Sequence, residues 1–237
     1  MFRTVRHWWF EGNGQHTARL FVFEFVVVVA GVLVAQSLGE WIHDREIDRQ
    51  VTEENARVEY QIGRTQQFDR VWSVAAPCFR ERMLSMIAAI DSGQRYPDDY
   101  LTLPAVVGYT VEPIPAAVAL PMRDKYGAKR MEDFFAANII AESGLTAAKD
   151  FRDQWTTFAL LNPRYGTLEG ADRASMRAAG AQALRDLGRI QLDAASLETL
   201  GTRLSIAPIA SAGGQATFPA HNCDEIWRTG RIARSSP

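Results

Sequence analysis

A near-continuous run of apolar residues lies close to the N-terminus, from Leu20 to Trp41. It reads LFVFEFVVVVAGVLVAQSLGEW, and Glu24 is the ionisable residue that interrupts its apolar part. A helix of about 22 residues is roughly 33 Å long, enough to cross a hydrocarbon core of about 30 Å. The pattern predicts a cytoplasmic segment over residues 1–19, one transmembrane helix over residues 20–42, and an extracytoplasmic domain over residues 43–237.

Helical spacing of apolar residues continues beyond the span. Val51, Val58, Thr65 and Trp72 are seven residues apart, and neither Gly nor Pro occurs between Trp41 and Gly63. This spacing predicts a stalk helix over residues 43–76. We expect Pro77 to end or kink that helix, or to lie in the first turn of a second one. The apolar stripe has two interpretations, a seam with a second copy of the chain or packing onto the chain's own later helices.

The remaining chain alternates between helical and loop patterns, which predicts an all-α fold. Ser143-Gly144 and Asn162-Pro163 are expected to separate helices. Residues 91–129 are rich in Pro and Gly and predict a long connection or short elements, and residues 206–220 predict a loop. The predicted architecture is one transmembrane helix that continues into a stalk and an extramembrane helical bundle. The later helices are expected over residues 130–142, 146–161, 168–190 and 193–204.

The charges that flank the span predict its orientation. Arg3, Arg6 and Arg19 precede it against the single carboxylate of Glu11, whereas acidic residues outnumber Arg just after it. Positive residues near a span stay in the cytoplasm. We therefore expect a bacterial inner-membrane protein whose bulk lies in the periplasm. A cleaved signal peptide is the alternative, because residues 35–37 read Ala-Gln-Ser and loosely fit a cleavage site.

Several residues inside the span are polar or small. Glu24 and Gln36 are intramembrane polar groups, and Glu24 is close enough to the cytoplasmic end for its carboxyl to reach the interface. Gly31, Ala35 and Gly39 form a small-xxx-small row on one helix face, which allows two helices to approach closely. The row makes these three residues candidates for packing between two spans, although such rows also arise by chance.

The span resembles the N-terminal signature of a group of one-span bacterial membrane proteins. In this sequence the signature corresponds to Glu24, the Val run 26–29, Gly31, Gln36 and Trp41. The usual Asn residues beside the Trp are replaced here by Gly39 and Glu40. The resemblance covers about 30 residues and implies a membrane anchor with a helical extramembrane domain of unknown function. It carries no established activity to transfer.

Composition and cysteine content change this picture only in detail. The net charge of −2 argues against a nucleic-acid partner. Cys78 and Cys223 are the only cysteines, and both fall in the part expected outside the cytoplasm. A disulfide between them is the default in an oxidising compartment, with two separate buried thiols as the alternative.

Candidate chemistry is sparse, and we predict no catalytic residue, no cofactor and no metal site. The stretch His221-Asn222-Cys223-Asp224 raises a thiol-nucleophile or metal hypothesis. The first needs a positioned base and oxyanion donors, and the second needs more ligands than the histidines near the span supply. The remaining histidines are His7, His16 and His43. Aromatic residues at helical spacing are interpreted as core rather than as a ligand cage: Phe134, Phe135, Phe151, Trp155 and Phe158.

The favoured function is therefore a non-enzymatic, membrane-anchored domain that interacts with an envelope protein or assembles with itself. Its partners would be the lipid bilayer, an unidentified envelope protein, and a second copy bound through the transmembrane helix and stalk. The alternative is a periplasmic sensor or small-ligand-binding domain, which would need a partner protein because 19 cytoplasmic residues cannot hold a transmitter. An envelope hydrolase is the least favoured hypothesis.

Overall fold

The computed structural model describes residues 14–103, 111–209, 223 and 226–227, with side chains from Arg19 onward. The described part of the chain contains helices and connecting segments and no strand, which confirms the all-α prediction. The chain divides into two compact units, residues 1–52 and residues 53–237. The helical bundle described below belongs to the second unit.

Helix α2 is a single element, Gly14–Ser92, which contains the predicted span and the predicted stalk. It ends at Gly93, whose φ of 72° is the left-handed conformation that glycine adopts without strain. The helix passes through Pro77, so the expectations that it ends there or that a second helix begins there are wrong. Pro77 and the preceding Ser73 are both exposed, so water can bond the Ser73 carbonyl that loses its N–H partner.

The proline-rich segment after α2 contains short helices, as predicted. Helix α3 is Asp98–Leu101, and helix α4 is Ala116–Tyr126. Pro121 lies inside α4, and Gly127, with a φ of 90°, separates α4 from the next helix. This connection allows the chain to return along the bundle before the next long helix begins.

The four predicted later helices merge into two long ones. Helix α5 is Ala128–Thr156 and continues through Ser143-Gly144, so the break predicted there is wrong. Helix α6 is Gly170–Leu204, so the predicted separation near residue 191 is also wrong. The break at Asn162-Pro163 is real, with 3-10 helices η1, Thr157–Leu161, and η2, Pro163–Tyr165, on either side of Asn162.

Both ends of α6 carry local signals that define its limits. Glu169 and Asp172 form a capping box at the start, in which the Asp172 side chain accepts from the Glu169 N–H at 3.0 Å. At the end, Ser205 has a left-handed φ of 59°, and the Ile206 N–H donates to the Gly201 carbonyl at 2.8 Å. The following segment contacts α2, where the Ile209 N–H donates to the Gly63 carbonyl at 3.0 Å.

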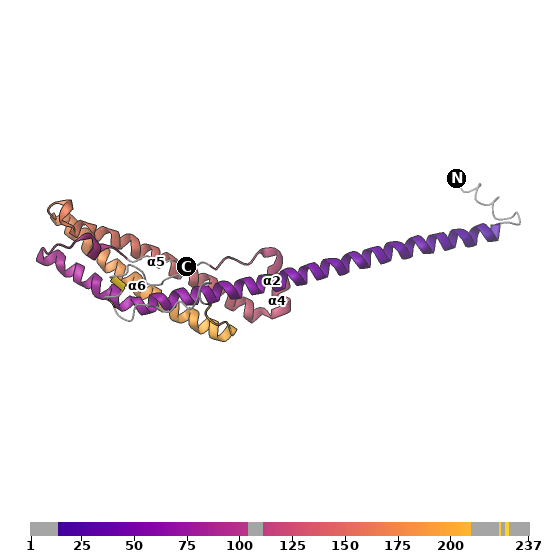
Figure 1. The fold of residues 1–237 in the computed structure, drawn as a ribbon. Coiled ribbons are helices and arrows are strands. Elements are labelled where there is room, and N and C mark those ends of the chain that lie inside the picture. The colour runs from indigo at the N-terminus through magenta and orange to yellow at the C-terminus, as the bar shows by residue number, and fades with distance from the viewer. Residues whose placement is uncertain (1–13, 104–110, 210–222, 224–225, 228–237) are drawn as a thin grey trace. The chain divides into compact units, whose positions relative to one another are not determined.

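In the second unit, the C-terminal part of α2 packs with α5 and α6 as a three-helix bundle (Figure 1). Ring contacts from Trp72 to Phe151 and from Phe79 to Trp155 advance together along α2 and α5, so these helices are parallel. Helix α6 is antiparallel to both. The Ile87 side chain lies against Gly180, and Gln66 lies against Gly201. The Arg203 guanidinium pairs with Asp133 of α5 at 3.2 Å.

The apolar stripe predicted along α2 is part of this chain's own core. Val58, Thr65 and Trp72 are buried in the second unit, and Val51 is buried as well. Val58, Thr65 and Trp72 therefore follow the second of the two interpretations and are not an exposed seam for another copy. The aromatic residues of α5 and η1 are also core, as predicted, except Phe135, which is 48% exposed. It follows the buried Phe134 by one position, about 100° around the helix, and faces outward.

Candidate functional site

The apolar part of α2 is exposed along its whole length in the first unit. Its large apolar side chains, from Leu20 to Ile42, are 39–69% exposed. Among the described residues, this is the one helix whose length and composition suit a membrane span. Such an apolar surface is stable in lipid and unfavourable in water.

The candidate residues within the span all lie on this exposed surface. Glu24 and Gln36 are exposed, and a Cβ added at Gly31 or Gly39 would meet no atom within 4 Å. Ala35 is exposed on the same helix. The row formed by Gly31, Ala35 and Gly39 is therefore free to contact another helix or lipid.

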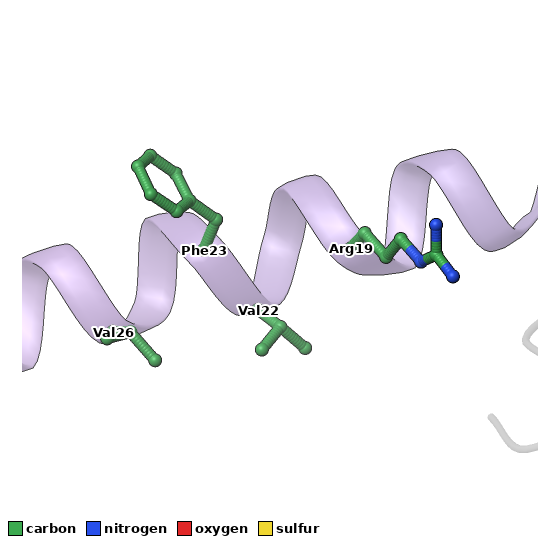
Figure 2. Close-up of a pocket in the computed structure, with 4 residues that line it drawn as sticks. All are labelled: Arg19, Val22, Phe23 and Val26. Carbon is green, nitrogen blue, oxygen red and sulfur yellow. The ribbon is translucent and has the colours of Figure 1, made fainter.

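The start of the span has the form expected at a membrane boundary. Figure 2 shows Val22 and Val26 on one side of the helix and Phe23 on another, with no enclosed cavity between them. The Arg19 side chain extends along the helix axis, away from these apolar groups. A long cationic side chain in this orientation can place its charge at the lipid headgroups while its stem stays in contact with the apolar surface.

The other end of the apolar run also carries an aromatic and a cation. The Arg45 guanidinium lies 4.1 Å from the centre of the Trp41 ring. Tryptophan and arginine are residues that commonly occupy the membrane–water interface. Arg19 and Trp41 therefore bracket the segment that suits the hydrocarbon core.

In the second unit, the two cysteines meet. Cys78 of α2 and Cys223 form a disulfide with their Cα atoms 5.2 Å apart, within the range that a disulfide requires. Cys78 is buried at 5% exposure, and Cys223 is partly buried. A sulfur bonded in this way is not a thiolate, so the structure does not support the nucleophile hypothesis for Cys223.

The two described residues that follow Cys223, Ile226 and Trp227, pack onto the aromatic core. Ile226 is buried, and the Trp227 ring lies 5.6 Å from Phe79 and 6.0 Å from Trp155. The Arg82 guanidinium lies between two rings, 3.7 Å from the centre of Tyr100 and 4.0 Å from that of Trp227. The disulfide and these contacts together attach the C-terminal segment to α2.

A polar seam runs between α2 and α6. The Gln66 side chain is 4% exposed and donates to the Leu197 carbonyl at 3.2 Å. A Cβ at Gly201 would lie 1.7 Å from the Gln66 Nε2, so only glycine leaves room for this amide. One turn further along α2 is Asp69, and one turn earlier on α6 is Asp193. The antiparallel register therefore places these two carboxylates opposite each other.

Asp69 is an unusual residue for a bundle core. It is 7% exposed, and within the described part of the chain no hydrogen-bond donor or cation contacts its carboxyl group. Burial, with a smaller contribution from the Asp193 carboxylate, raises the pKa of Asp69 to about 7. Asp193 has partners: it accepts a hydrogen bond from the Ser143 hydroxyl of α5 at 2.6 Å, and Arg189 lies 3.9 Å away.

The sequence did not lead us to predict this polar contact between α2 and α6. Asp69 lies three residues before Trp72 and four after Thr65, so it shares the helix face that the heptad spacing assigned to packing. An acidic residue at a core-facing position was the available signal. The metal hypothesis gains nothing here, because the described residues contain no group of three potential ligands, and His221 and Asp224 lie outside them.

Comparisons with models of known protein families, with curated proteins and with solved structures find no significant match. The resemblance of the span to a group of one-span bacterial proteins therefore stays a prediction.

Proposed function

We propose that this chain is a membrane-anchored, extracytoplasmic helical domain that acts in the bacterial envelope as a non-enzymatic interaction or assembly module. The observation that carries the proposal is the exposed apolar segment between Arg19 and Trp41, whose large apolar side chains are 39–69% exposed. A surface of this extent is explained by lipid contact. The Arg residues before the span favour retention of the N-terminal side in the cytoplasm.

The second unit is consistent with an extracytoplasmic location. A disulfide joins its first long helix to its C-terminal segment, and disulfides persist mainly in oxidising compartments.

Two features of the second unit support an interaction module. The titratable residues with the least exposure, such as Asp69, are inside the helix packing rather than on an accessible surface. On the surface of α5, Phe135 and Ile139 are exposed one turn apart, which gives an apolar area suited to contact with another protein.

For assembly, we propose that two copies associate through the span. The row of Gly31, Ala35 and Gly39 allows close approach, and these residues are exposed in the single chain. The part of the seam predicted beyond Val51 is excluded from this contact because those side chains are buried. Self-association would therefore depend on the membrane segment.

The topology can be tested with two reporter fusions placed after Pro237. We expect activity from a reporter enzyme that matures only in the periplasm, and no signal from a fluorescent protein that matures only in the cytoplasm. A matched variant in which Arg3, Arg6 and Arg19 are changed to Glu should weaken this asymmetry, because it removes the positive charge that sets orientation. Activity confined to the cytoplasmic reporter in the unchanged chain would contradict the proposal.

A further inference from the structure

We propose that Asp69, Ser143 and Asp193 form a proton-dependent clasp between α2 and α6, closed while Asp69 carries a proton and loosened when both carboxylates are ionised. The register supports it independently of any titration, because Gln66 is bonded to the Leu197 carbonyl one turn away. This bond places Asp69 of α2 against Asp193 of α6. Asp69 is 7% exposed, so its carboxyl cannot be charged opposite the Asp193 carboxylate without cost.

The surroundings assign the proton to Asp69. Asp193 accepts from the Ser143 hydroxyl at 2.6 Å, and the Arg189 Nε donates to the same hydroxyl at 3.0 Å. Asp69 has no comparable partner among the described residues and is the more buried of the two. A buried carboxyl group without a donor or cation is stable as the neutral acid.

Within the described residues, the packed helices direct few charged groups toward Asp69. Helix α6 contributes Asp193, with Arg189 behind it, and α5 contributes the Ser143 hydroxyl, which does not titrate in this range. One turn away, Arg70 and Glu198 form an exposed pair at 3.3 Å across the same two helices. Neither member of that pair adds charge to the buried layer.

The direction of the pH effect follows from the proton balance. When α2 and α6 separate, Asp69 enters water and ionises near its ordinary pKa of 3.8, whereas in the closed clasp its pKa is about 7. The closed form therefore binds more protons than the open form between these two values. The equilibrium constant for opening should rise by about tenfold per pH unit from roughly pH 4.5 to 6.5 and should level off above about pH 7.

Hydrogen–deuterium exchange of the full chain in detergent, followed by mass spectrometry, tests this directly. Amide exchange is itself accelerated by about tenfold per pH unit, so an ordinary opening gives a slope near 1 for log rate against pH. We expect α6 peptides around Asp193–Leu197 to give a slope near 2 between about pH 4.5 and 6.5, and a return to about 1 above pH 7.

Variants identify the group responsible. Asp69→Asn should give a slope near 1 throughout, while Asp153→Asn, at an exposed position of α5, should keep the two-slope profile. A slope near 1 in the unchanged chain, or a slope near 2 in Asp69→Asn, would overturn the clasp. If Asp69→Asn does not fold, the variant Asp193→Asn provides the test. Removal of the facing charge should lower the pH at which the slope returns from about 2 to about 1. If that pH is unchanged, the proposal is rejected. The measurement does not depend on which side of a membrane the bundle occupies, so it fails or succeeds separately from the proposed function.

Discussion

Cys78 and Cys223 show how much a single pair of residues contributes to the second unit. They are separated by 145 positions, so their bond closes almost the whole bundle into one loop. The loop-closure model gives such a bond about 4–5 kcal/mol of stabilisation as an upper figure. The bond also fixes Trp227 beside Phe79 and Trp155, where its ring adds to the aromatic core.

We predict that the double variant Cys78→Ser, Cys223→Ser lowers the free energy of unfolding by about 2–5 kcal/mol. Chemical denaturation of the purified protein, followed by circular dichroism, measures the loss. Adding reductant to the unchanged protein should produce a similar loss, whereas the double variant should not respond to it. Mass spectrometry without reductant should find peptides containing Cys78 and Cys223 linked. An unchanged unfolding midpoint in reductant would show that the bond contributes no stability.

The two cysteines and Asp69 differ in how readily the sequence reveals them. Two cysteines in a chain expected outside the cytoplasm have one possible intramolecular pairing, so the pair could be predicted without a structure. The burial of Asp69 depends on which face of α2 is covered by α6. The register that brings it to Asp193 is set by Gln66 and Gly201, residues 135 positions apart that no local pattern connects.

Among the elements, α2 and α5 show why helix existence is easier to predict than helix ends. Helical spacing identified both, yet Pro77 and Ser143-Gly144 suggested breaks that are absent. The freed carbonyl before Pro77 faces solvent. Gly144 is buried, and a Cβ there would lie 3.7 Å from the Asp193 Cβ, so this small residue marks a helix contact rather than a helix end. Only the tertiary packing distinguishes these cases.

Close packing of α6 makes two of its glycines respond oppositely to the same change. At Gly180 a Cβ would lie 2.7 Å from two atoms of Ile87 and 3.1 Å from Phe158, whereas at Gly188 it would meet nothing within 4 Å. We predict that Gly180→Ala destabilises the bundle by about 1–3 kcal/mol through overpacking. Gly188→Ala should stabilise it by up to about 1 kcal/mol, because alanine is the better helix former.

Denaturation midpoints of the two single variants, measured side by side with the unchanged chain, test this pair. Because both positions lie in α6 and gain the same methyl group, their difference isolates packing from helix propensity. A stabilising Gly180→Ala would mean that α2 and α6 are not in the described register near Ile87.

For the whole molecule, the proposed assembly through the span gives a crosslinking prediction. A single cysteine at Gly39 should form a disulfide-linked dimer in native membranes, because this position belongs to the row proposed to contact the second copy. The native cysteines are already paired, so the new thiol is free to react. Gly31→Leu should reduce that dimer by at least severalfold, because a large side chain separates the two helix backbones. The control Val32→Leu enlarges the side chain at the neighbouring position, which is not part of the small-residue row, and should have little effect on the dimer.

The crosslinking result shows whether the small-residue row mediates self-association. A dimer that Gly31→Leu leaves undiminished would place the contact elsewhere than the small-residue row. If no dimer forms at all, the span does not mediate self-association, and the proposed interaction would have to be with a different protein.

The disulfide has a further consequence for how the protein responds to proteases. Residues Phe79 to Asn222 lie between its two half-cystines, so one backbone cut anywhere in that stretch produces two fragments that remain covalently joined. The C-terminal fragment would stay attached through Cys223 to α2, the helix that carries the apolar segment. A nicked molecule would therefore run as a full-length band on a gel without reductant and as two bands with it, and limited cleavage would not separate the C-terminal fragment from the apolar helix.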